Sequence, residues 1–130
     1  MRTRNAPRGD YAEHLAQRVY GGELAPNSVK SYDQLAADRS RIQVKARAVG
    51  ADTRAGAVFS AFRSFDFDVA VLIAFDSDTY AVLQAREVPA ADLKAAGRQS
   101  EHINGRLIPI STGLRLGVDV TDKFHAALST

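Results

Sequence analysis

Val69-Ala70-Val71-Leu72-Ile73-Ala74-Phe75 is the longest uninterrupted apolar run in this chain of 130 residues. It does not alternate between polar and apolar residues, which is typical of a strand covered on both faces in the middle of a sheet. The run is also far shorter than the roughly 20 apolar residues of a membrane-spanning helix. We therefore expect a buried central strand and no insertion into a membrane.

The residues that follow this run predict two more strands and two helices. Turn residues, apolar alternation, an early proline and a later glycine mark their limits. The expected order is a turn at Asp76–Asp78, a strand over Thr79–Val88, a helix between Pro89 and Gly97, a turn at Asn104-Gly105, a short strand over Leu107–Ile110 and a terminal helix capped by Thr121.

The residues that precede the run predict a helix and a β-hairpin. The helix starts with Asp10 as its N-cap and ends at Gly21-Gly22. Two segments in period-two alternation, Ser28–Ala36 and Arg41–Val49, form the hairpin, while Gly50–Asp68 is compatible with a loop, a strand or a short helix. The order predicts an α/β or α+β fold, in which helices cover a mixed sheet.

Composition sets the class of protein. The chain has 45% hydrophobic and 25% charged residues and no cysteine, so thiolate metal sites and disulfides are excluded and a cytoplasmic location is expected. Residues 1–9 are expected to form a flexible basic arm, and residues 10–130 a single domain. Residues 1–63 contain 11 Lys and Arg against 6 Asp and Glu, whereas residues 64–130 contain 6 against 9. The basic first half is the better candidate to face an anion such as nucleic acid, although arginine-rich composition alone does not demonstrate such a partner.

The second hairpin strand carries the chemically informative residues. Its alternation places Gln43, Lys45 and Arg47 on one face, opposite the apolar residues of the same strand. Asp33 lies in the preceding strand and Glu13 in the first helix. This arrangement resembles the PD-(D/E)XK nuclease superfamily, which is similar in having a carboxylate on one strand and an acid-x-Lys motif on the next. Ser31-Tyr32-Asp33 matches the first element and Ile42-Gln43-Val44-Lys45 the second, over about half the chain.

The resemblance implies a restriction-endonuclease-like mixed sheet flanked by helices and a Mg²⁺ or Mn²⁺ site. Asp33, the Gln43 amide oxygen and the Val44 carbonyl are the metal ligands that it implies, and such oxygen donors suit Mg²⁺. Lys45 would orient the attacking water and offset charge on the phosphate. Gln43 departs from the usual acid, which removes one negative charge. Glu13 is the candidate to restore that charge, or else completes a capping box with Asp10.

Three arginines, Arg47, Arg54 and Arg63, are the candidate DNA-binding residues. Phe59, Phe62 and Phe65 lie among them in the sequence and form either a base-stacking platform or part of the core.

The first hypothesis is a metal-dependent endonuclease-like enzyme that hydrolyses phosphodiester bonds in DNA. A homodimer and a larger partner that recognises sequence are compatible with this hypothesis. The alternative is a catalytically inactive domain of the same fold that acts as a DNA-binding or assembly module. A third hypothesis is a small structural or regulatory protein with no nucleic-acid role.

Overall fold

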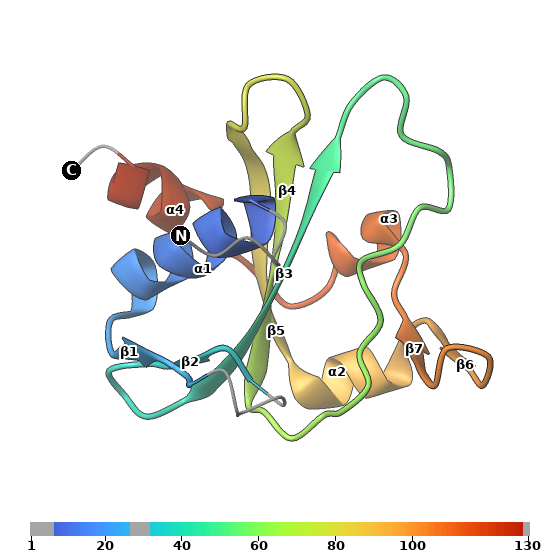
Figure 1. Ribbon diagram of the computed structural model, residues 1–130, viewed down its shortest axis with the longest axis horizontal. Coiled ribbons are helices and arrows are strands. Elements are labelled where there is room, and N and C mark those ends of the chain that lie inside the picture. The colour runs from blue at the N-terminus through green and yellow to red at the C-terminus, as the bar shows by residue number, and fades with distance from the viewer. Residues whose placement is uncertain (1–6, 27–31, 129–130) are drawn as a thin grey trace.

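The computed structural model of the protein describes residues 7–26 and 32–128 (Figure 1). The elements in chain order are α1 (Pro7–Tyr20), β1 (Glu23–Leu24), β2 (Gln34–Leu35), β3 (Arg41–Val49), β4 (Val69–Asp76), β5 (Val82–Pro89), α2 (Ala90–Ala95), β6 (Arg98–Ser100), β7 (Gly105–Leu107), α3 (Ile110–Gly113), β8 (Val118–Asp119) and α4 (Thr121–Leu128). Helices and a mixed sheet are thus both present, and the predicted α+β class is confirmed.

The main sheet has the strand order β1-β2-β3-β4-β5-β8. Strands β3 and β4 are parallel, and all the remaining neighbouring pairs in this sheet are antiparallel. Strands β6 and β7 form a separate two-stranded hairpin, with Asn104 at φ 53° in the predicted turn. The helices lie in two layers, α1 and α4 on one face of the sheet and α2 and α3 on the other (Figure 1).

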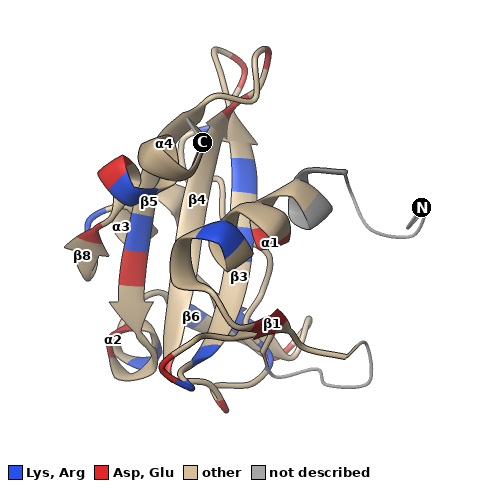
Figure 2. Ribbon diagram, turned by 90° about the vertical axis from the view of Figure 1, so that its left-hand side faces the viewer, with Lys and Arg blue, Asp and Glu red and all other residues tan. Residues whose placement is uncertain are grey.

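Strand β4 is the buried central strand that the apolar run predicts. Val71, Ile73 and Phe75 pack with α1 and α4, whereas Ala70 and Leu72 pack on the opposite face with α2 and α3. Figure 2 shows β4 running between β3 and β5, which both carry charged residues. Burial on both faces explains why this stretch has no polar alternation.

The first helix begins earlier than predicted. Helix α1 starts at Pro7, inside the segment expected to be a flexible arm, so Asp10 is not its N-cap and the capping box with Glu13 is wrong. The other residues assigned to the arm, 1–6, lie outside the described residues. The end of the helix is confirmed, since Gly21 has φ 73° and its N–H donates to the Gln17 carbonyl.

Strand boundaries also differ in places. Strand β3 has its predicted limits, but its hairpin partner β2 is only Gln34–Leu35, and residues 27–31 of the predicted strand lie outside the described residues. Strand β5 starts at Val82 rather than Thr79, because Asp76 accepts hydrogen bonds from the turn that follows it. The expected strand Leu107–Ile110 is replaced by β7 and the one-turn helix α3.

The connection between β3 and β4, residues 50–68, is an irregular segment that packs on the α2 and α3 side of the sheet. Phe59, Phe62 and Phe67 are buried there and Phe65 is half-buried, so these rings form core rather than an exposed stacking platform. Parallel strands need a long crossover connection. In this protein the phenylalanines of the connection pack it against the sheet. Within the described residues, no helix is both long and apolar enough to span a membrane.

Candidate functional site

The site is built on β3, whose alternation divides apolar from polar side chains. Ile42 and Val44 are buried toward α1, as predicted. Gln43 and Lys45 are half-buried and Arg47 is exposed on the other face, which also carries the phenylalanine-rich connection.

Asp33 lies where the pairing of β2 with β3 ends. Its N–H donates to the Ile42 carbonyl at 2.7 Å, and its carboxylate Oδ2 accepts the Val44 N–H at 2.7 Å. The carboxylate therefore takes the place of a main-chain acceptor in the ladder. This contact brings Asp33 against the middle residue of Gln43-Val44-Lys45, so the structure places these predicted site residues together.

The Val44 carbonyl faces the same sheet edge as Asp33. The N–H and C=O of one strand residue point to the same neighbour, and the Val44 N–H points away from β4 toward Asp33. The Gln43 side chain lies one residue earlier and, among the described residues, makes no hydrogen bond. The amide and carbonyl oxygens thus belong to two consecutive residues of β3, Gln43 and Val44, and the carboxylate belongs to Asp33, which bonds to the second of them.

Lys45 extends along the sheet under the connection between β3 and β4. Its Nζ donates to the Ala61 carbonyl at 3.2 Å and lies 5.0 Å from the centre of the Phe62 ring. Burial lowers the pKa of Lys45, the nearby Asp33 carboxylate opposes this shift, and Arg63 adds to it. The ammonium is therefore held in a place that favours its neutral form more than water does.

Asp33 is shifted in the opposite direction. Burial raises the pKa of Asp33, while the Val44 N–H and the charge of Lys45 hold it down. The charge of each group thus opposes the effect that burial has on the pKa of the other. Opposed shifts on an acid and a base are a common feature of catalytic sites.

Glu13 is half-buried on α1. That helix packs through Ala12, Leu15 and Ala16 against the face of the sheet opposite to the Lys45 side chain. A role for Glu13 in the site therefore remains a prediction.

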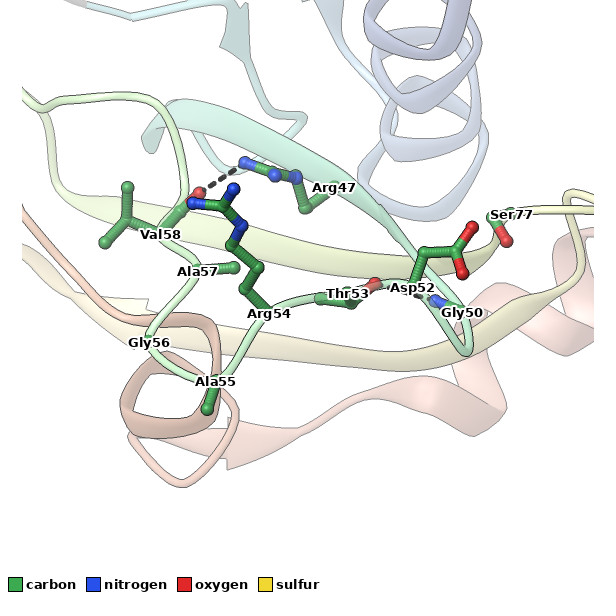
Figure 3. A pocket seen from close by; sticks show the side chains of 10 residues that line it. All are labelled: Arg47, Gly50, Asp52, Thr53, Arg54, Ala55, Gly56, Ala57, Val58 and Ser77. Carbon is green, nitrogen blue, oxygen red and sulfur yellow. Dashed lines mark hydrogen bonds between the residues drawn. The ribbon is translucent and has the colours of Figure 1, made fainter.

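The three candidate DNA-binding arginines separate into two groups. Arg63 lies near Lys45 and its Nε donates to the Ile103 carbonyl at 3.3 Å. Arg47 and Arg54 instead line a pocket beyond the end of β3, where Arg47 donates to the Val58 carbonyl at 2.8 Å (Figure 3). Strand β3 thus carries cationic groups from the Asp33 contact to its carboxyl end.

Gln34 is a positioning residue that the sequence analysis missed. Its side chain is fully buried and its Nε2 donates to the carbonyls of Ala16, at 3.3 Å, and Gly21, at 2.7 Å. These bonds join β2 to the end of α1 and hold the backbone next to Asp33. A polar residue at an inward-facing strand position was the available signal.

Asp33, Gln43 and Val44 carry oxygen atoms of the chemical kinds that bind divalent cations. Mg²⁺ takes oxygen ligands and usually retains several waters, so few protein ligands are needed. Within the described part of the chain, no three His, Cys, Asp or Glu side chains gather in one group. The donor set at β3 therefore combines one carboxylate with an amide and a main-chain carbonyl.

No protein-family model matches the sequence, and no curated protein does either. The geometry of β2, β3 and the segment that covers Lys45 is therefore the evidence for a function.

Proposed function

We propose that this protein is a metal-dependent endonuclease-like enzyme that hydrolyses phosphodiester bonds in DNA with Mg²⁺ or Mn²⁺. The observation that carries the proposal is the contact of the Asp33 carboxylate with the N–H of Val44, the residue before Lys45 on β3, whose Nζ is held by the Ala61 carbonyl. The same sequence elements carry the resemblance to the PD-(D/E)XK superfamily and its restriction-endonuclease-like sheet.

Asp33, the Gln43 amide oxygen and the Val44 carbonyl would hold the cation. When bound, a divalent cation polarises a phosphoryl oxygen and lowers the pKa of a coordinated water. Lys45 would orient the attacking water and stabilise the charge that develops on the phosphate. Because its pKa is lowered by burial, the Lys45 ammonium releases a proton more readily than an exposed lysine does. From the opposite face of the sheet, Glu13 of α1 would contribute its negative charge across the sheet rather than as a metal ligand.

The arginines on and after β3 would bind phosphate groups of the DNA. Guanidinium groups form paired hydrogen bonds with phosphate, which suits Arg47, Arg54 and Arg63 to this role. A homodimer, with each copy cutting one strand, and a larger partner that recognises sequence belong to the same proposal, as does a cytoplasmic setting.

The test is cleavage of supercoiled plasmid DNA with Mg²⁺, Mn²⁺ or EDTA. We expect nicking with either metal and none in EDTA. Asp33→Asn should remove the activity, while Asp78→Asn, which changes an exposed turn carboxylate, should retain it. Equal activity in wild type and Asp33→Asn would reject this site as the source of cleavage.

The alternative is an inactive domain of the same fold that binds DNA or organises an assembly. Gln43 favours it, because the amide leaves Asp33 as the one carboxylate in the proposed ligand set on β2 and β3. This function predicts DNA binding that weakens steeply with salt, since neutralised phosphates release counterions, together with no cleavage in any divalent metal.

A further inference from the structure

A pocket of about 650 Å³ lies at the carboxyl end of the parallel strands β3 and β4. Its walls come from Arg47 near the end of β3, from the following loop and from Ser77 just after β4. Figure 3 shows the loop enclosing one side of this space. The carboxyl ends of strands in open α/β sheets commonly form ligand sites, and the volume falls in the range of small-molecule pockets.

The charge on the pocket wall is unbalanced. Arg47 and Arg54 both point toward Val58 at one end, whereas Asp52 points toward Ser77 at the other (Figure 3). Among the described residues, neither arginine forms an ion pair. The end that holds the two guanidinium groups therefore has positive charge without a described protein counterion.

The loop that forms the wall is internally bonded. The Gly50 N–H donates to Thr53 Oγ1 at 2.8 Å, and the Ser77 N–H donates to the Val49 carbonyl at 2.9 Å. A Cβ at Gly50 would lie 2.3 Å from Ser77 Oγ, so a side chain at position 50 would make the Ser77 hydroxyl rotate away. One N–H of Arg47 is fixed on Val58, which orients the remaining donors of its guanidinium.

We propose that this pocket binds a phosphomonoester dianion, the terminal phosphate of a nucleic-acid strand. Two guanidinium groups can each form paired hydrogen bonds with phosphate oxygens. A phosphomonoester carries a charge of about −1.5 to −2 at pH 7, which matches two arginines better than a carboxylate or an internal phosphodiester does.

The position of the pocket relative to Lys45 extends the proposed nuclease function. That the ligand is a nucleic-acid strand rests on that proposed function. Arg47 follows Lys45 by two residues on the same face of β3, a separation of roughly 6.6 Å along the strand. A strand end held at Arg47 and Arg54 would therefore bring a nearby phosphodiester to Asp33 and Lys45. Cleavage would then depend on distance from a phosphorylated end.

The experiment measures binding in EDTA, so that it does not depend on cleavage. Inorganic phosphate and a short single-stranded oligonucleotide, with either a 5′-phosphate, a 3′-phosphate or hydroxyl ends, are titrated into the protein at constant ionic strength. Amide NMR signals of the pocket loop and fluorescence anisotropy report binding. Wild type is compared with Arg54→Gln and with Arg98→Gln, which removes an exposed arginine of β6 outside the pocket.

We expect inorganic phosphate to shift the Gly50, Thr53 and Ser77 signals. We also expect one end-phosphorylated oligonucleotide to bind at least tenfold more tightly than the hydroxyl form. Arg54→Gln should abolish this preference and Arg98→Gln should keep it. Equal binding of all oligonucleotides to wild type would overturn the proposal. This holds if Arg54→Gln weakens the binding of every oligonucleotide, as loss of a backbone contact would, and also if it weakens the binding of none. Plasmid cleavage that persists alongside such a result would leave the nuclease proposal standing.

Discussion

Replacing Lys45 with methionine separates the catalytic use of its ammonium from the packing of its side chain. Lys45→Met keeps an unbranched, flexible chain under the phenylalanine-rich connection and removes the charge. The lost interactions are the bond from Nζ to the Ala61 carbonyl at 3.2 Å and the contact with the Phe62 ring at 5.0 Å. A hydrogen bond to a charged group contributes about 1.5–3 kcal/mol, and a cation–π contact about 0.5–2 kcal/mol.

Relief of desolvation offsets this loss. Holding an ammonium out of water costs several kcal/mol, and burial is the largest cause of the lowered pKa of Lys45. We therefore expect the free energy of unfolding of Lys45→Met to equal that of wild type or exceed it by about 1 kcal/mol at neutral pH. The pKa of Lys45 is lower in the folded state than in the unfolded state. Wild type therefore loses stability as the pH falls from the ordinary pKa of lysine to the lowered pKa of the folded state. The difference in free energy of unfolding between Lys45→Met and wild type should narrow above the ordinary pKa of lysine.

Urea denaturation at several pH values measures the stability, and plasmid nicking with Mn²⁺ measures the activity. We expect cleavage to fall by about 10²–10³, as for removal of one group that stabilises transition-state charge. Lys123→Met, which changes an exposed lysine of α4, is the matched control and should retain both properties. A destabilisation of more than about 3 kcal/mol with unchanged cleavage would refute the reasoning and make Lys45 a structural anchor.

Three other substitutions test the site and the core. Gln43→Glu restores the acid of the PD-(D/E)XK motif, so we expect tighter binding of Mn²⁺ and faster nicking; weaker binding in a metal titration would remove Gln43 from the ligand set. Asp33→Asn should lose the rise in melting temperature that Mn²⁺ causes in wild type. Burial raises the pKa of Asp33, and protonation of Asp33 competes with metal binding, so the Mn²⁺ effect in wild type should weaken on acidification. A Mn²⁺ effect independent of pH would contradict the placement of Asp33 in the ligand set. Phe59→Ala should lower the free energy of unfolding by about 3–5 kcal/mol. A urea midpoint close to that of wild type would contradict the burial of Phe59.

The candidate site could be predicted in part because its residues lie on two segments close together in the sequence. Alternation along β3 is a local property, and it correctly places Gln43 and Lys45 on one face. Antiparallel pairing with β2 then brings Asp33 near them. The burial of Lys45 could not be predicted this way, because the group that covers it, the Ala61 carbonyl, belongs to a segment without periodicity.

The start of α1 shows a limit of local signals. Asp10 and Glu13 have capping-box spacing, but the helix begins at Pro7, since proline is favoured in a first helical turn. Side-chain capping is worth about 1 kcal/mol, so it does not determine where a packed helix starts.

Local sequence patterns were enough to predict the buried strand β4, the limits of β3 and the hairpin turn at Asn104-Gly105, because strand periodicity and turn conformation depend on neighbouring residues. Packing between distant segments, in contrast, buries the phenylalanines of residues 50–68 and brings Arg47 and Arg54 into one pocket. Those outcomes depend on which distant segments exclude water from one another, and that is a property of the packed chain rather than of any one stretch of it.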